Sequence, residues 1–196
     1  ANNASAVPTP VEMKLIPLRS LQMYDGTSLN DLPANTQWTV EEDPIRGKVY
    51  SDGVGPYLPN LKKRMTLRDI PIKGAQKLVL QYWSSQSLED GYDRGDVFAS
   101  YQGMPESNWR NVDYVTGKSG WQLRTVDLTQ HAFDAAAQGV DAIQIHFEMS
   151  TDAYVQYDGW LIDDISILIN DSAVVLTGIP GSTSNSPNLN IGVTAT

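Results

Sequence analysis

Apolar residues occur along this chain in short runs that turn residues interrupt. The runs cover residues 13–18, 36–40, 48–50, 64–67, 77–83, 96–101, 109–115, 121–128, 142–149 and 159–169. Many short runs at this spacing are typical of antiparallel β-sandwiches and barrels. The pattern therefore predicts an all-β fold, and we expect an antiparallel jelly-roll β-sandwich with one short connecting helix.

Alternation of apolar and polar residues is clearest in the run 142–149. Four residues share its apolar face: Ile143, Ile145, Phe147 and Met149. Gln144, His146 and Glu148 lie between them, so the pattern predicts a core face and a solvent face. The predicted helix covers residues 129–138, where Thr129 is a candidate cap and Gly139 can end the helix.

The closing run, 159–169, carries two adjacent carboxylates, Asp163 and Asp164, among β-branched and aromatic residues. In a regular strand the two side chains point to opposite faces, so at least one should face the core. An ionised Asp there costs several kcal/mol unless it is paired, hydrogen-bonded or bound to a cation. With few bases available, a hard cation is one interpretation and a hydrogen-bonded structural Asp is the other. A single β-bulge would reverse which Asp faces inward.

A second acidic feature is the segment 89–96, in which Glu89, Asp90, Asp93 and Asp96 accompany one base, Arg94. These carboxylates would repel one another without a cation. Calcium takes six to eight oxygen ligands, which an acidic loop with glycines can supply. The alternative is a solvated turn in which Arg94 pairs with a neighbour.

Composition narrows the class of protein. The chain has 196 residues, a formal net charge of -9 and no cysteine. The negative charge argues against partners such as nucleic acid or an anionic membrane. Absence of cysteine excludes disulfides and thiolate metal sites. No apolar run approaches the roughly 20 residues of a membrane-spanning helix, and the opening Ala-Asn-Asn-Ala-Ser does not indicate a signal peptide.

Several blocks resemble, in the right order, the jelly-roll modules called cleaved adhesin or choice-of-anchor J domains. These are MAM-like domains that also occur beside immune inhibitor A type metallopeptidases. The matching blocks are the strand 77–83, the acidic loop 89–96, Trp109, Gly120-Trp121 before Asp127-Leu128, and the closing GWLIDD at 159–164.

The resemblance covers roughly residues 61–169. It implies a structural calcium ion held by Glu89, Asp90, Asp93 and either Asp164 or Asp163. Arg94, inserted between Asp93 and Gly95, departs from the commonest family spacing.

Catalytic motifs are missing from the sequence. His131 and His146 are isolated, and neither HExxH nor GxSxG occurs. Side chains of adjacent strand residues cannot flank one sugar bond, so Asp163 and Asp164 do not indicate a glycosidase. We therefore predict no enzyme activity.

Aromatic residues suggest binding. Four lie near turns and could stack on sugar rings or anchor a protein: Tyr57, Tyr92, Trp109 and Tyr154. Trp83, Trp121 and Trp160, in contrast, are predicted to fill the core.

Three segments follow from these patterns: a linker or tail at 1–12, the sandwich at 13–170, and a linker with a further strand at 171–196. That strand, 189–196, would belong to a following domain or be donated to a neighbouring subunit.

We predict a non-catalytic extracellular adhesion or recognition module of a larger bacterial surface or secreted protein, with calcium. Its partner would be a protein or glycan on a cell surface or matrix. One alternative is a self-assembling filament or surface-layer subunit joined by tail-strand exchange. The other is a carbohydrate-binding or accessory domain of a secreted peptidase.

Overall fold

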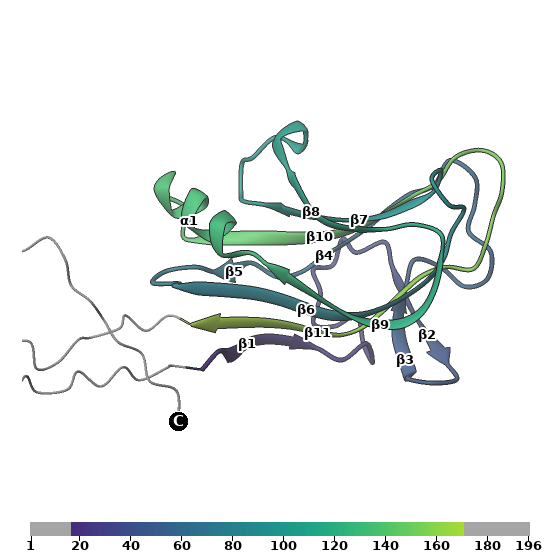
Figure 1. Cartoon of the computed structure of the whole chain (residues 1–196), viewed down its shortest axis with the longest axis horizontal. Helices are drawn as coiled ribbons and strands as arrows, with labels where there is room; N and C mark the ends of the chain where they lie inside the picture. The colour runs from purple at the N-terminus through teal and green to yellow at the C-terminus, as the bar shows by residue number, and fades with distance from the viewer. Residues whose placement is uncertain (1–16, 171–196) are drawn as a thin grey trace, which may run out of the picture. The chain divides into compact units, whose positions relative to one another are not determined.

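Two antiparallel sheets lie face to face in the computed structural model, which describes residues 17–170 (Figure 1). The six-stranded sheet has the order β2 (Thr39–Asp43), β3 (Gly47–Ser51), β11 (Gly159–Asn170), β6 (Lys77–Ser87), β9 (Lys118–Asp127), with β1 (Arg19–Tyr24) also beside β11. The five-stranded sheet has the order β4 (Lys62–Thr66), β10 (Ala142–Ser150), β7 (Arg94–Ser100), β8 (Arg110–Val115), with β5 (Ile70–Pro71) beside β10. The predicted all-β jelly-roll sandwich is therefore confirmed.

The strand predictions differ from the structure at the beginning of the chain. β1 lies at Arg19–Tyr24 and contains a register shift between Ser20 and Gln22, which breaks the alternation that sequence analysis relies on. The strand predicted at 13–18 lies almost wholly outside the described residues. The predictions for segments 1–12 and 171–196 lie outside them too, and stay predictions.

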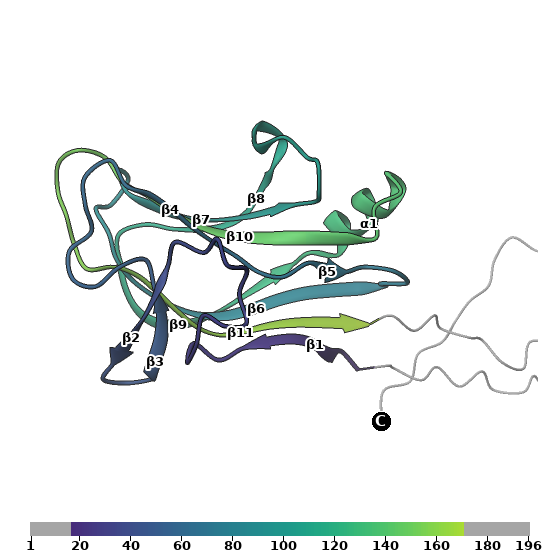
Figure 2. The ribbon, with the colours of Figure 1, turned by 180° about the vertical axis from the view of Figure 1, so that it is seen from behind.

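Helix α1 (Thr129–Ala137) confirms the predicted helix but not its cap. Thr129 is already inside the helix and no side chain caps it at Leu128. The Thr129 hydroxyl oxygen instead accepts a hydrogen bond from Leu78 N at 3.1 Å, which ties the helix to β6. In both views α1 lies at one end of the sandwich and the long loops lie at the other (Figures 1 and 2). A short 3-10 helix, η1 (Glu106–Asn108), precedes β8.

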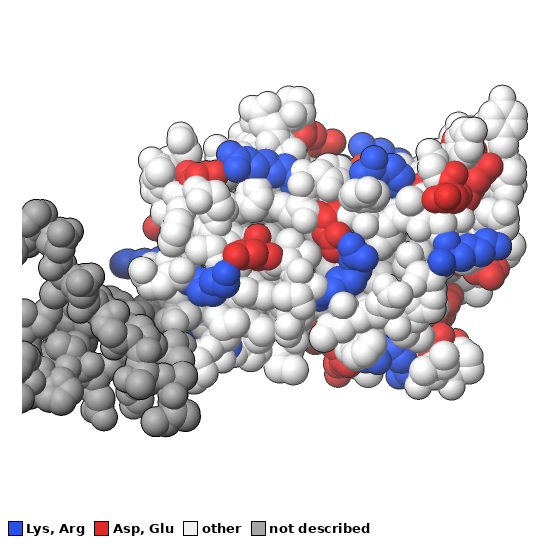
Figure 3. Space-filling model, viewed as in Figure 1, with Lys and Arg blue, Asp and Glu red and all other residues white. Residues whose placement is uncertain are grey.

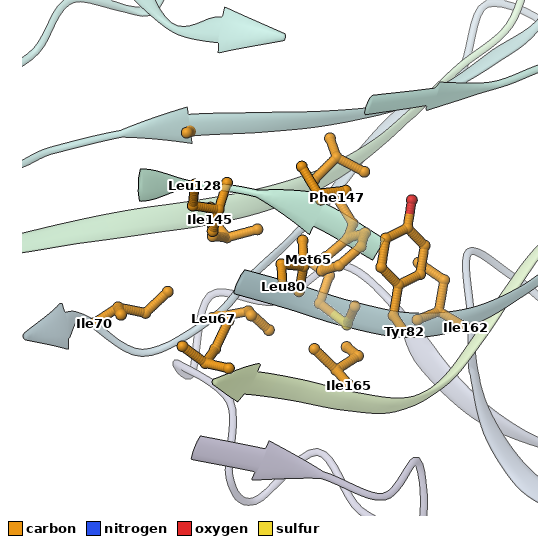
Figure 4. Packing of buried hydrophobic residues seen from close by; sticks show 14 of the residues in the cluster. Met65, Leu67, Ile70, Leu80, Tyr82, Leu128, Ile145, Phe147, Ile162 and Ile165 are labelled. Atoms are coloured by element: carbon orange, nitrogen blue, oxygen red, sulfur yellow. The ribbon is translucent and has the colours of Figure 1, made fainter. Parts of the chain in front are cut away.

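The core fills the space between the sheets (Figure 4). The predicted apolar face of β10 is confirmed, since all four of its residues are buried. Tyr82 packs edge-on against Phe147 at 5.1 Å between ring centroids, and Trp160 packs edge-on against Phe147 at 5.8 Å. These contacts join β6, β10 and β11 across the sandwich.

The other face of β10 is not the solvent face that alternation predicts. His146 and Glu148 are both buried. Trp109 stacks on the His146 ring at 3.9 Å, and Arg64 Nε donates to Glu148 Oε2 at 2.9 Å. β10 is a central strand of its sheet, so long side chains from neighbouring segments cover its outer face.

Candidate functional site: the acidic residues and the loop end

A β-bulge in β11 decides where the paired carboxylates point. Asp163 pairs with Trp83 and Ser166 pairs with Gln81, so Asp164 and Ile165 together stand opposite one residue of β6. Asp164 has a φ of 47°, in the left-handed region, and this conformation accommodates the extra residue of the bulge. The core row contains Trp160 and Ile162 before the bulge and Ile165, Ile167 and Ile169 after it. The expectation that one Asp faces the core is therefore wrong, because the bulge turns both away from it.

Arg46, in the turn between β2 and β3, neutralises both carboxylates. Its Nε lies 2.6 Å from Asp163 Oδ2, and its Nη2 contacts Asp164 Oδ2. The guanidinium also lies over the rings of Trp83 and Trp121, at 4.6 Å and 5.3 Å from their centroids. Arg46 is therefore one of the few bases of the chain, and it satisfies these carboxylates as the structural alternative expected. Trp83 and Trp121 flank this ion pair and are only half-buried, unlike Trp160, which is in the predicted core.

Asp163 remains incompletely satisfied. Burial raises the pKa of its carboxyl group, and the ion pair with Arg46 only partly offsets that effect. Its Oδ1 is buried with no hydrogen-bond partner. Gly26 leaves room for it, since a Cβ at that position would lie 2.7 Å from Asp163 Oδ1 and 2.8 Å from the carbonyl oxygen of Lys48.

The acidic loop between β6 and β7 is held by hydrogen bonds. Asp93 is fully buried, and its Oδ2 accepts from the Tyr57 hydroxyl while its Oδ1 accepts from Asp152 N at 2.8 Å. Arg94 Nη2 lies 2.6 Å from Asp96 Oδ1, which is the neighbour pairing that the alternative interpretation expected. One group stays unsatisfied, because Glu89 Oε2 is buried without a partner.

The predicted calcium ligands lie in two separate places. Asp163 lies in β11 and pairs with Trp83 inside β6, whereas Glu89, Asp90 and Asp93 lie in the loop that follows the end of β6 at Ser87. The single site shared by Glu89, Asp90 and Asp93 with Asp163 or Asp164 stays a prediction. Within residues 17–170 no group of three or more His, Cys, Asp or Glu side chains is arranged to hold a metal. Calcium itself stays a prediction.

The four aromatic residues that were predicted to contact a ligand differ in their exposure. Tyr57 is buried by its contact with Asp93, and Trp109 has His146 on one face and the Arg64 guanidinium 4.4 Å from its ring centroid. Neither ring is free to stack on a ligand. Tyr92 and Tyr154, in contrast, are 68% and 81% exposed.

Further exposed apolar residues lie on the loops at this end of the sandwich. Val54 and Leu58 lie in the β3–β4 loop, and Val155 follows Tyr154 in the β10–β11 loop. Isolated apolar residues in loops carry no periodic signal, so sequence analysis missed them. We call this surface, made by Val54, Leu58, Tyr92, Tyr154 and Val155, the loop end.

The loops that carry the loop end are braced against one another. Tyr57 N donates to Tyr157 O at 2.9 Å and Asn60 N donates to Asp152 O at 2.7 Å, which ties the β3–β4 loop to the β10–β11 loop. The same loops carry Glu89, Asp90, Asp152 and Asp158. On the face shown in Figure 3, acidic side chains gather at this end of the molecule.

Two buried ionisable groups, Asp52 and His146, change the stability of the fold in opposite directions as pH changes. Burial raises the pKa of Asp52 to about 6, although its Oδ1 accepts from Trp160 N at 2.6 Å. Burial and the nearby Arg64 lower the pKa of His146 to about 4. The stability that Asp52 contributes is fully present below pH 3.8 and is lost as pH rises through 6. The stability that His146 contributes is fully present above pH 6.5 and is lost as pH falls through 4.

Asp52→Asn is therefore expected to stabilise the protein in a pH-dependent way. At pH 4 the variant and the wild type should unfold with nearly equal free energies, because Asp52 is then protonated. At pH 7 the variant should be more stable by about 1–3 kcal/mol, because the buried charge is gone. Urea unfolding between pH 4 and pH 8 measures this difference, and a constant gap over that range would contradict the assignment.

Within the described residues, no helix has the length and apolar character needed to cross a membrane. No protein-family model matches the chain.

Bacillopeptidase F of Bacillus subtilis (strain 168) is 32% identical to this chain over 128 residues, which is 64% of this chain but only 8% of that protein. Solved structures similar to the chain include the K3 cleaved adhesin domain of Lys-gingipain from Porphyromonas gingivalis, with a TM-score of 0.47 and 16% identity over 76% of this chain and 99% of that one. Another is TmCBM27, a carbohydrate-binding module for specific mannan recognition, with a TM-score of 0.42 and 12% identity. The match covers 79% of this chain and 99% of that one.

Proposed function

We propose that this chain is a non-catalytic recognition module of a larger bacterial secreted or surface protein, and that the loop end is its contact surface for a glycan or protein. The observation that carries the proposal is the exposure of Tyr92 and Tyr154 on loops that buried hydrogen bonds hold in place. Rigid loops that present aromatic rings bind with a small loss of conformational entropy.

The contacts of the acidic residues support binding over catalysis. Asp163 and Asp164 pair with Arg46, and Asp93 is hydrogen-bonded in the interior. His146 lies between two hydroxyls, Thr66 Oγ1 at 2.9 Å and Ser100 Oγ at 2.7 Å. These groups stabilise the fold and do not converge on the loop end.

The likeness to part of Bacillopeptidase F supports a module that accompanies a peptidase. Because the match covers 8% of that protein, we propose the association and not the peptidase activity for this chain. The self-assembly alternative depends on tail segments that lie outside the described residues.

Calcium belongs to the proposal in a revised form. The two buried carboxylate oxygens without partners in residues 17–170 are Glu89 Oε2 and Asp163 Oδ1, and both belong to the predicted ligand set. An unsatisfied buried carboxylate oxygen favours a nearby cation. Glu89 lies in the loop after β6 and Asp163 lies within β11, and we propose each as a separate position.

The loop end is tested by a double substitution, Tyr92→Ala with Tyr154→Ala. We expect binding to immobilised glycans and matrix proteins to fall at least about tenfold, because exposed aromatic anchors carry most of the energy of such contacts. Phe133→Ala is the matched control, since Phe133 is also an exposed aromatic residue but lies on α1, at the opposite end. Equal losses in both variants, or none in either, would overturn the assignment to the loop end.

A further inference from the structure

A small cavity lies beneath α1, at the end of the sandwich opposite the loop end. Its volume is about 100 Å³, and α1, β7 and β10 form its walls. The buried residues Ala99, Ala135 and Ile143 contribute apolar walls. Nothing assigned above to the loop end or to the acidic residues involves this cavity.

The size of the cavity limits what can enter it. A cavity of about 150 Å³ holds one benzene molecule. A cavity of about 100 Å³ therefore suits a group of roughly four or five heavy atoms, and a whole sugar ring is too large for it. The ligand must insert one substituent and leave the rest outside.

The polar residues around the cavity favour a neutral group that both donates and accepts. Arg110 Nη1 and Asp134 Oδ2 lie 2.7 Å apart, so a donor and an acceptor stand side by side and their charges compensate. Burial and the nearby Arg110 lower the pKa of His131, which favours its neutral form. A charged ligand, such as a carboxylate or an ammonium group, would gain little here, because Arg110 and Asp134 already neutralise each other.

A secondary amide with a small alkyl end matches these features. Its N–H can donate to Asp134, its carbonyl oxygen can accept from Arg110, and its alkyl end can contact the apolar walls. A peptide backbone continues on both sides of each amide, and a cavity of this size has no room for that continuation. An acetamido group ends in a methyl and fits.

We propose that the cavity beneath α1 binds the acetamido group of an N-acetylated amino sugar. The sugar ring would stay outside, beside Tyr101 and Met104, which also line the site. This second site goes beyond the recognition surface proposed at the loop end and does not depend on it.

Titration of the whole chain with N,N′-diacetylchitobiose, followed by NMR of the α1 amides, tests the proposal. Cellobiose is the matched ligand, because it carries a hydroxyl in place of each acetamido group. We expect cellobiose to bind at least tenfold more weakly. Ala135→Leu fills the cavity and should abolish binding, while Arg110→Ala, an exposed position, should weaken binding about tenfold and leave the fold unchanged.

Ile45→Ala, at an exposed position in the turn between β2 and β3, should bind diacetylchitobiose like the wild type. Equal binding of both disaccharides, no binding of diacetylchitobiose, or binding that Arg110→Ala leaves unchanged would overturn the proposal. N-acetylglycine amide is the third ligand, and binding as tight as that of the sugar would overturn the assignment to a sugar. None of these results bears on the loop end, whose failure would appear only in the Tyr92 and Tyr154 variants.

Discussion

Arg46→Ala is expected to lower the free energy of unfolding by about 3–5 kcal/mol, because it leaves Asp163 buried without a counter-charge. Asp163 is 4% exposed, and its second oxygen already has no partner. The substitution also removes the cation from between Trp83 and Trp121. Lys48→Ala is the control, since Lys48 is an exposed base in the same hairpin and should change the free energy of unfolding little.

Chemical unfolding with and without millimolar Ca²⁺ then tests whether a metal ion can replace the Arg46 guanidinium beside Asp163. Calcium should restore part of the loss in Arg46→Ala, because it can neutralise Asp163 and Asp164 once the guanidinium is gone. Adding Asp163→Asn to Arg46→Ala should recover stability without calcium and remove the calcium effect. A loss below about 1 kcal/mol in Arg46→Ala would show that this ion pair does not compensate a buried charge.

The sequence predicts the strands of this protein better than it predicts the faces of those strands. Alternation identified the core face of β10, where each apolar residue is buried. It misplaced the outer face of the same strand, because Trp109 and Arg64 come from other segments to cover His146 and Glu148.

The acidic residues show the same limit more sharply. Counting charges indicated that a buried Asp needs a cation, and the structure places Arg46 there from a distant hairpin. Nothing in the local pattern predicts that contact, nor the bulge at Asp164 that keeps both carboxylates off the core row of β11. Similarly, Asp93 in the acidic loop is satisfied by Tyr57, an aromatic residue that sequence alone suggested for ligand binding.

Gly95→Ala is expected to destabilise the protein by roughly 3–5 kcal/mol or to prevent folding, because the new methyl group would overlap a ring that cannot move. A Cβ at Gly95 would lie 2.3 Å from Cε3 of Trp160. Trp160 is fully buried, its Nε1 donates to Ser84 Oγ at 2.8 Å, and its backbone N donates to Asp52 Oδ1 at 2.6 Å.

Gly120→Ala is the matched control, because Gly120 is also a strand glycine but a Cβ there would meet no atom within 4 Å. Urea unfolding and the soluble yield of both variants measure the difference, and a stable Gly95→Ala protein would show that the two strands are not this close. The contact joins the end of the acidic loop to the closing GWLIDD block, two blocks of the resemblance that lie far apart in sequence. Gly95 and Trp160 therefore depend on each other in packing, since the indole fills the space that only a glycine leaves open on β7.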